Sequence, residues 1–361
     1  MAVTSAATGL TPQQWDSKFF TEYVSASRFN KYMGKNENAM IQVKTDLTVK
    51  PGNKVTYAAV RSLANAGVTG NTTLKGNEES LDSRSMAITV DVLRHAVTMT
   101  AWEEQKSAIA LRDAARTQLK TWAMDTLRND LVAAMGNING VAHASATEAQ
   151  KDAWLVDNAD RTMFGDTLDN NDGADHSASL GVIASTEIFD TGQASIAKRF
   201  ASQANPRIKP IRVEGSEGEQ EWYIWWANTY SFRDMQASLA QTNREARPRD
   251  VMSNPLFNSG DLLWDGMIIK ELPEIASLGA VGASSAVIRP NYLCGAQALG
   301  LAWAQRTKTT VDVDDFDFQH GVGIQEIRGV DKLVFGSGAT DTADLKDNGI
   351  LTLYSASAAD T

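Results

Sequence analysis

Cysteine and histidine are scarce in this sequence. Its 361 residues include one cysteine, Cys294, and four histidines that lie far apart along the chain. A single cysteine excludes an internal disulfide framework and any zinc site that needs two or more thiolates from this chain. Cys294 lies in an apolar segment with no base nearby, so we interpret it as a small packed hydrophobe. We therefore predict no metal site and no cofactor.

Basic charge and long hydrophobic runs are also limited. The chain has 34 basic and 44 acidic residues, a net charge of −10, which argues against a protein that grips nucleic-acid phosphates. The longest uncharged stretches, Ile275–Ile288 and Pro290–Gln305, hold 14 and 16 residues and are too short to span a bilayer. The first charged side chain is Asp16, so a secretory signal is not expected. We predict a soluble protein made inside the cell, without membrane contact.

Motifs of enzymes are missing or broken. The Gly321/Gly323 and Gly336/Gly338 pairs lack the third glycine of a dinucleotide fingerprint, and neither a phosphate loop nor a Gly-x-Ser-x-Gly elbow occurs. The acidic run Asp166–Asp175 fails as a calcium loop, because Leu168 and Ser179 occupy the first and last ligand positions. The aspartates of Asp312–Asp317 are interpreted as a solvated strand face, with metal ligation as the less favoured alternative. No catalytic residue is predicted.

Two segments near the N-terminus carry the candidate subunit contacts. Thr11 and Pro12 open a predicted helix whose Trp15, Phe19 and Tyr23 recur every four residues on one stripe. This stripe packs either on its own domain or on a neighbouring subunit. Strand-like runs over 55–60 and 86–98 then flank a glycine- and threonine-rich segment, 65–76. That pattern predicts a long two-armed excursion with a mobile tip.

A long helix is predicted next. Glu103–Met135 contains neither glycine nor proline over 33 residues and shows an apolar face, and Gly136 ends it. At 1.5 Å per residue this helix would be roughly 50 Å long. It is interpreted as a structural spine.

The remainder interleaves helices and strands without a doubly wound alternation, which indicates an α+β fold. Three tryptophans in Trp222–Trp226 predict a strand that meets protein on both faces, in preference to a carbohydrate or base platform. The predicted elements are strands over 181–186, 222–226, 267–270 and much of 322–354, and helices over 192–203 and 293–304.

The order of these elements, together with several local motifs, is similar to the major capsid proteins of tailed bacteriophages with the Hong Kong 97-type fold. Several of the local motifs resemble those of the subfamily typified by phage N-four. The motifs that carry the resemblance are Leu74-Lys75-Gly76-Asn77-Glu78-Glu79, Arg94-His95-Ala96-Val97, Asn254-Pro255-Leu256-Phe257 with Asp265-Gly266, Leu293-Cys294-Gly295-Ala296-Gln297-Ala298-Leu299, and Asp315-Phe316 with Gly329 and Lys332-Leu333-Val334-Phe335.

The resemblance implies a division of the chain into named parts. An N-terminal arm would span 1–40. A peripheral domain would span 41–136, with an extended β-hairpin loop at about 50–90 and the spine helix at 103–136. An axial domain would span 137–325, and C-terminal strands over 326–361 would return to the peripheral domain.

The implied function is self-assembly as pentamers and hexamers into an icosahedral shell that encloses a double-stranded DNA genome, without catalysis, cofactor or sequence-specific DNA binding. Scaffolding, portal and decoration proteins would be partners, and the virion would be assembled in the cytoplasm of a bacterial host. The expected subunit-contact residues are Trp15, Phe19, Tyr23, Leu74, Lys75 and Gly76. The alternatives are an encapsulin-like shell around a protein cargo, a soluble metal-dependent hydrolase, and a carbohydrate- or host-binding protein.

The net charge is unevenly divided along the chain. Residues 1–136 hold 16 basic and 13 acidic side chains, a net +3, while 137–361 hold 18 and 31, a net −13. The mildly positive part contains the arm and loop that are expected to reach neighbours, so complementary contact between subunits is predicted. Raised salt should weaken such contacts.

Overall fold

The computed structural model describes residues 28–48, 51–60, 67–71, 73–79, 83–108, 110–215, 218–246, 261–338, 340–358 and 360. Two compact units divide the chain. Unit 1 takes its described residues from Met1–Val55, Ile88–Met135 and Leu299–Asp331, and unit 2 from Thr56–Ala87, Gly136–Ala298 and Lys332–Thr361. Within the described residues, no helix combines the length and the apolar character that crossing a membrane requires.

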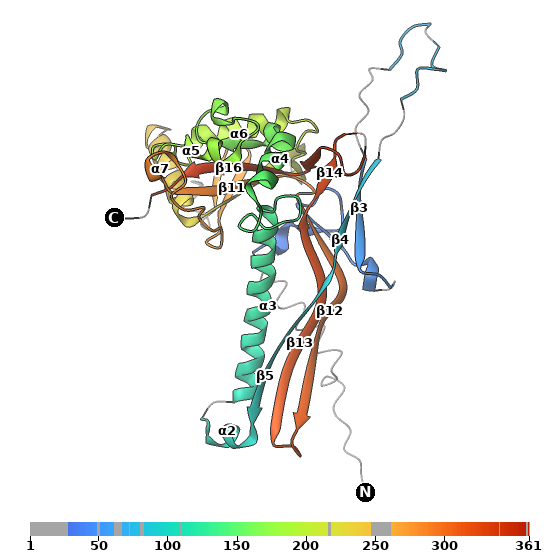
Figure 1. The fold of residues 1–361 in the computed structure, drawn as a ribbon, viewed down its shortest axis with the longest axis vertical. Helices are drawn as coiled ribbons and strands as arrows, with labels where there is room; N and C mark the ends of the chain where they lie inside the picture. The colour runs from blue at the N-terminus through green and yellow to red at the C-terminus, as the bar shows by residue number, and fades with distance from the viewer. Residues whose placement is uncertain are drawn as a thin grey trace. The chain divides into compact units, whose positions relative to one another are not determined.

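Unit 1 is built on a five-stranded sheet (Figure 1). Its strand order is β1 (Met33–Gly34), β2 (Ile41–Lys44), β12 (Leu299–Asp314), β13 (Gln319–Lys332) and β5 (Asp91–Thr100). The antiparallel pairing of β13 with β5 runs from Gln319 opposite Thr100 to Arg328 opposite Asp91. The pairing of β2 with β12 is parallel and covers only Leu299–Ala302 of the longer strand. Most of β12 therefore extends beyond β2.

The expected spine consists of two helices, so the prediction of one helix over 103–136 was wrong at its N-terminal end. The first, α2, spans Ala101–Lys106, and the second, α3, spans Leu111–Met135. Thr100 caps α2, since its hydroxyl accepts from Glu103 N at 3.3 Å. Ser107 ends α2 because its backbone is extended, with φ −80° and ψ 134°. Neither glycine nor proline marks this break in the sequence.

The apolar face of α3 lies where the sequence predicts it. Five of its fully or nearly fully buried side chains recur at intervals of four residues: Ala115, Leu119, Ala123, Leu127 and Leu131. Such spacing places side chains on one stripe of a helix. At 1.5 Å per residue, 25 residues give a rod about 37 Å long. A charge cluster also links this helix to the sheet, since the buried Arg328 contacts the half-exposed Asp130 of α3 and the buried Glu326 at 2.7 Å each.

Unit 2 contains a seven-stranded sheet. Its path is β6 (Thr162–Phe164), β16 (Ile350–Ala356), β11 (Ile288–Cys294), β8 (Gly218–Ala227), β10 (Met267–Glu271) and β9 (Leu262–Trp264), and β7 (Ile211–Gly215) also pairs with β8. Two separate pairs of strands complete the β structure: β3 (Lys54–Val60) with β4 (Ser83–Thr89), and β14 (Val334–Gly336) with β15 (Leu345–Asp347).

The helices of unit 2 pack on its sheet (Figure 1). They are α4 (Glu148–Asn158), α5 (His176–Gly181), α6 (Thr191–Gln203) and α7 (Thr229–Ala246). Short 3-10 turns among the described residues are Asn30–Tyr32, Asp46–Thr48, Ala159–Arg161, Leu168–Asn170 and Ala283–Ser285. The helix over 192–203 is thus confirmed, as are the strands at 222–226 and 267–270 and those over 322–354. Trp225 and Trp226 are both fully buried although neighbours in a strand face opposite sides, so β8 meets protein on both faces, as expected.

Two further element predictions were wrong. The predicted helix over 293–304 is the end of β11, a turn at Gly295–Ala298 and the start of β12. A short apolar run fits a buried strand as well as a buried helix, and here pairing with β16 and β2 decides for strands. The predicted strand over 181–186 is the end of α5 followed by a turn.

The C-terminal third is also divided differently from the expected domains. We expected 137–325 to form one domain and 326–361 to return to the peripheral one. The contacts instead group Leu299–Asp331 with unit 1 and Lys332–Thr361 with unit 2. Strand pairing is the reason, because β12 and β13 pair with β2 and β5, while β16 pairs with β11 and β6.

Candidate functional site

The first candidate site is the exposed segment between β3 and β4, which contains three of the predicted contact residues. Leu74 is 60% exposed, and Lys75 and Gly76 are exposed beside it. Gly76 has a φ of +92°, a conformation that glycine adopts without steric cost. Its N–H donates to Glu78 Oε2 at 2.6 Å, and the Asn77 side-chain amide donates to Thr73 O at 2.8 Å. Local hydrogen bonds within 73–78 therefore shape a turn in which the Leu74 side chain is exposed to solvent.

The other predicted contact residues, Trp15, Phe19 and Tyr23, lie outside the described residues. The strands below the turn have a plain alternation in β3, where Val55 and Tyr57 are buried between exposed residues. In β4, Arg84 donates to Gly338 O at 2.8 Å, and Ser85 donates to Asp341 Oδ2 at 2.8 Å. These side chains fasten β4 to the 338–341 loop.

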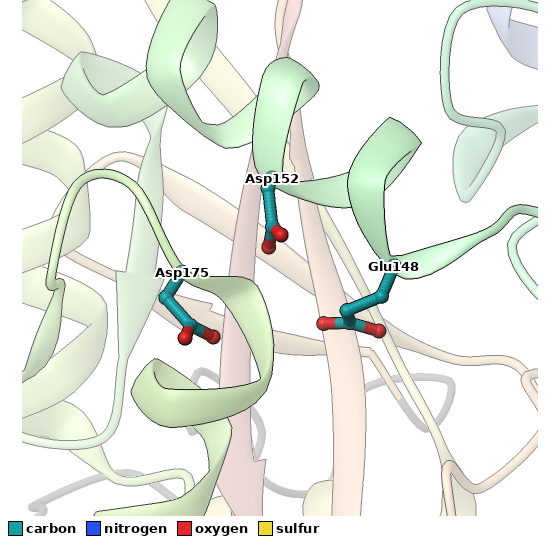
Figure 2. Close-up of side chains that lie close together, drawn as sticks. All are labelled: Glu148, Asp152 and Asp175. Carbon is teal, nitrogen blue, oxygen red and sulfur yellow. The ribbon is translucent and has the colours of Figure 1, made fainter.

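The second candidate is a group of carboxylates at the facing ends of α4 and α5. Glu148, Asp152 and Asp175 each place a carboxylate oxygen within 4.8 Å of the other two (Figure 2). Oxygen ligands of this kind suit hard divalent cations. In the sequence Asp175 stands out only as part of the acidic 166–175 run, and nothing in the local sequence indicates that α4 lies beside α5.

Each of these carboxylates already has a partner in the protein. Asp175 is the N-cap of α5, and it accepts from Ala178 N at 2.8 Å and Ser177 Oγ at 2.9 Å, hydrogen bonds that lower its pKa. Asp152 accepts from His176 N at 2.9 Å. Glu148 lies 3.6 Å from Lys151 Nζ and 3.8 Å from His176 Nδ1. The arrangement joins α4 to the start of α5 without needing a metal.

A pair of histidines, His143 and His176, lies close to the carboxylates of α4 and α5. The rings of His143 and His176 are 5.5 Å apart, although the sequence separates them widely. His176 is almost fully buried among Trp154, Phe164 and Tyr354, and its Nε2 lies 3.4 Å from Tyr354 Oη. Burial lowers the pKa of His143 to about 4 and that of His176 to about 3. Both rings are therefore neutral near pH 7. The four histidines lie far apart along the chain, and only the fold brings these two together.

The structure also places Cys294 and the aspartates of 312–317, which the sequence analysis interpreted. Cys294 is fully buried in β11, and burial raises the pKa of its thiol, which agrees with a packed hydrophobe. The aspartates of 312–317 are exposed, as expected, but only Asp312 and Asp314 lie in a strand. Asp315 and Asp317 belong to the turn between β12 and β13.

Comparison with solved structures defines the class of this fold. The chain superposes on "Cyanophage Pam1 capsid asymmetric unit" with a TM-score of 0.81 and 32% sequence identity, covering 100% of both chains. It is also similar to "Capsid of Ralstonia phage GP4", with a TM-score of 0.72 and 18% identity over 93% of this chain and 92% of that one. Both are phage capsid structures, so the fold is that of a shell-forming structural protein.

The sequence comparisons make the assignment specific. A family model described as "Phage capsid protein" matches residues 3–359. The major capsid protein of Pseudomonas phage KPP25 is 26% identical over 359 residues, which is 94% of this chain and 93% of that protein. The chain therefore belongs to the phage capsid protein family. It is a structural protein of the virion shell and not an enzyme, as the sequence predicted.

Proposed function

We propose that this chain is the major capsid subunit of a tailed phage, and that its copies assemble as pentamers and hexamers into an icosahedral shell around double-stranded DNA. The full-length similarity to the cyanophage Pam1 capsid chain carries this proposal, because it spans both units and the hairpin. The net charge of −10 supports enclosure of DNA without sequence-specific binding, since tight phosphate contact requires clustered basic residues.

Roles for the parts of the chain belong to the same proposal. Unit 1, with α3 and the long strands β12 and β13, serves as the peripheral domain. Unit 2, with its seven-stranded sheet, serves as the axial domain around the symmetry axes. The β3–β4 hairpin overlies a neighbouring subunit through Leu74, Lys75 and Gly76. The N-terminal segment with Trp15, Phe19 and Tyr23 forms an arm that contacts another copy.

The remaining partners follow from how such a shell is built. Separate scaffolding protein guides assembly in the cytoplasm of a bacterial host, a portal protein occupies one vertex, and decoration proteins bind the finished surface. We expect no cofactor for this function, because contacts between subunits are sufficient to hold a shell together.

Electron microscopy and analytical ultracentrifugation of the purified chain test the proposal. We expect closed shells of uniform size that sediment far ahead of the free subunit, and particles from infected cells should contain DNA. A concentration series that yields only monomers or small oligomers would contradict shell formation. Shells from infected cells that contain protein cargo without DNA would contradict the phage assignment and favour the encapsulin-like alternative.

A further inference from the structure

An apolar surface stands at one end of unit 1. The turn between β12 and β13 lies beside α2 at this end, and Ala101 N donates to Phe318 O at 2.8 Å (Figure 1). The large apolar side chains that are exposed here are Trp102, Val311, Val313, Phe316 and Phe318. We call this set the distal patch. Isolated apolar residues are ordinary on protein surfaces, but several large ones that are exposed on neighbouring elements at one end of a unit indicate a contact site.

Phe316 is the most exposed member of the distal patch, because its side chain is wholly in solvent. Its backbone is also unusual. Asp315, Phe316 and Asp317 all have positive φ, at 49°, 54° and 71°. Aspartate tolerates this region, but it is rare for a bulky aromatic residue. The turn is closed by Phe318 N, which donates to Asp315 O at 3.1 Å. The turn thus holds Phe316 in a strained conformation that buries nothing in its own chain.

The acidic residues around Phe316 indicate which kind of surface this turn can contact. Phe316 is flanked by exposed aspartates, and no lysine or arginine occurs between Lys308 and Arg328. Among the described residues, the Asp315 carboxylate has no hydrogen bond or ion pair. The surface that receives this turn should therefore combine an exposed aromatic ring with positive charge.

The same end of unit 1 offers an exposed ring with a cation beside it, on a helix that also carries Glu103 and Glu104, the latter paired with Arg112. Trp102 of α2 is 60% exposed, and Lys106 Nζ lies 5.0 Å from the centre of its ring. Phe316 of the same chain does not cover this ring, because Phe316 is fully exposed. Phe316 with its flanking aspartates is therefore complementary to Trp102 with Lys106. Because the two rings do not meet within one chain, such a contact requires two different copies.

We propose that Phe316 of one copy packs against Trp102 and Lys106 of a second copy of this chain, as an anchor between subunits. The contact is head-to-tail, since the turn of each copy meets α2 of the next. Repetition of a head-to-tail contact around an axis closes a ring of copies. The inference rests on the proposed shell function and adds a specific pair of contacting surfaces to it.

Removal of the anchor gives the first test. Phe316→Ser should leave the circular dichroism and the melting temperature of the free chain unchanged, because the side chain packs on nothing in that chain. It should raise the protein concentration needed for shell assembly at least tenfold, as loss of a central aromatic anchor does. Val156→Ser is the matched control, since Val156 is 58% exposed on α4 in unit 2. It should assemble like the unmodified chain, and equal assembly by Phe316→Ser would overturn the proposal.

Site-directed crosslinking tests the partner directly. Cys294 is buried, so introduced cysteines are the reactive thiols at the surface. Shells are assembled from a mixture of Phe316→Cys and Trp102→Cys chains and oxidised mildly. We expect disulfide-linked dimers that contain one chain of each kind, which cannot form within a single chain. Val156→Cys mixed with Trp102→Cys is the control and should give none.

Failure of the proposed shell function and failure of the proposed contact of Phe316 would give different experimental results. If the unmodified chain forms no shells, the proposed function is wrong. If it forms shells but the mixture of Phe316→Cys and Trp102→Cys gives no mixed dimers, shell formation stands and only the contact between the distal patch and α2 is overturned. Shells in which a different protein covers Phe316 would give this second result.

Discussion

The buried histidine pair shows how single residues couple stability to pH. Desolvation disfavours the charged ring, so the folded-state pKa values of His143 and His176 are about 4 and about 3, below the value of about 6.5 for an exposed histidine. Between these limits the unfolded chain binds protons that the folded chain does not. Stability is therefore fully present above about pH 6.5 and is lost as pH falls.

We predict that acidification from pH 7 to 4.5 lowers the free energy of unfolding, with about 2–3 kcal/mol of the loss due to His176. Replacement by a neutral side chain, His176→Gln, should flatten this dependence while costing some stability at pH 7. Urea titrations at several pH values measure it. His95→Gln is the control, because His95 is exposed. An unchanged slope in His176→Gln would contradict the assignment.

At the scale of elements, a buried ion pair joins the end of β13 to β15. Lys332 Nζ lies 2.6 Å from Asp347 Oδ2, and both side chains are 1% exposed. Trp154 Nε1 of α4 donates to the same oxygen at 3.3 Å, and Arg161 donates to Asp347 O. The Asp347 carboxylate thus joins β15 to both β13 and α4, while Arg161 holds the backbone of the same residue.

We predict that Asp347→Ala destabilises the chain by about 3–5 kcal/mol, because it leaves a buried ammonium without its partner. The double replacement Lys332→Met with Asp347→Leu should be far less costly, since it removes both charges. Thermal or urea unfolding measures both. Asp125→Ala, which breaks a more exposed pair with Arg128, is the control and should cost about 0–1 kcal/mol. Equal losses in Asp347→Ala and the double variant would argue against an unpaired charge as the cause.

Some helices and strands can be predicted from the sequence pattern alone, and others cannot. The interior of α3 is predictable, because its buried residues repeat every four positions and no glycine or proline interrupts them. Its start is not, because neither glycine nor proline marks the break that begins at Ser107. The 293–304 run lacks any period, and whether it folds as helix or strand depends on partners that lie far away in the sequence.

At the scale of the whole molecule, the exposed turn at Leu74 and the charge distribution concern assembly. Residues 1–136 carry a net +3 and residues 137–361 a net −13. Lys75 stands on an exposed turn within the positive part. Opposite charge on a neighbouring copy would favour the contact at low ionic strength and lose effect as salt screens it.

We predict that Leu74→Ser with Lys75→Glu weakens shell assembly and reduces its sensitivity to salt, while the fold of the free chain is unchanged. Light scattering during assembly at about 50 and about 500 mM salt measures both effects. Electrostatic attraction between subunits is weakly screened at the lower concentration and strongly screened at the higher one. Val182→Ser, an exposed apolar residue of unit 2, is the control. Assembly that is insensitive to salt in the unmodified chain would contradict the electrostatic part of the proposal.

The sequence by itself determined the protein class, the absence of enzyme motifs, the extended hairpin, the apolar stripe of α3 and the doubly buried β8. These depend on local periodicity, turn chemistry and the order of elements, which are all visible along the chain. Only the tertiary structure decided which strands pair, which unit receives 299–331, and that His143 meets His176. It also set Phe316 and Trp102 at one end of unit 1. Such juxtapositions arise from contacts between distant segments, and no local pattern records them.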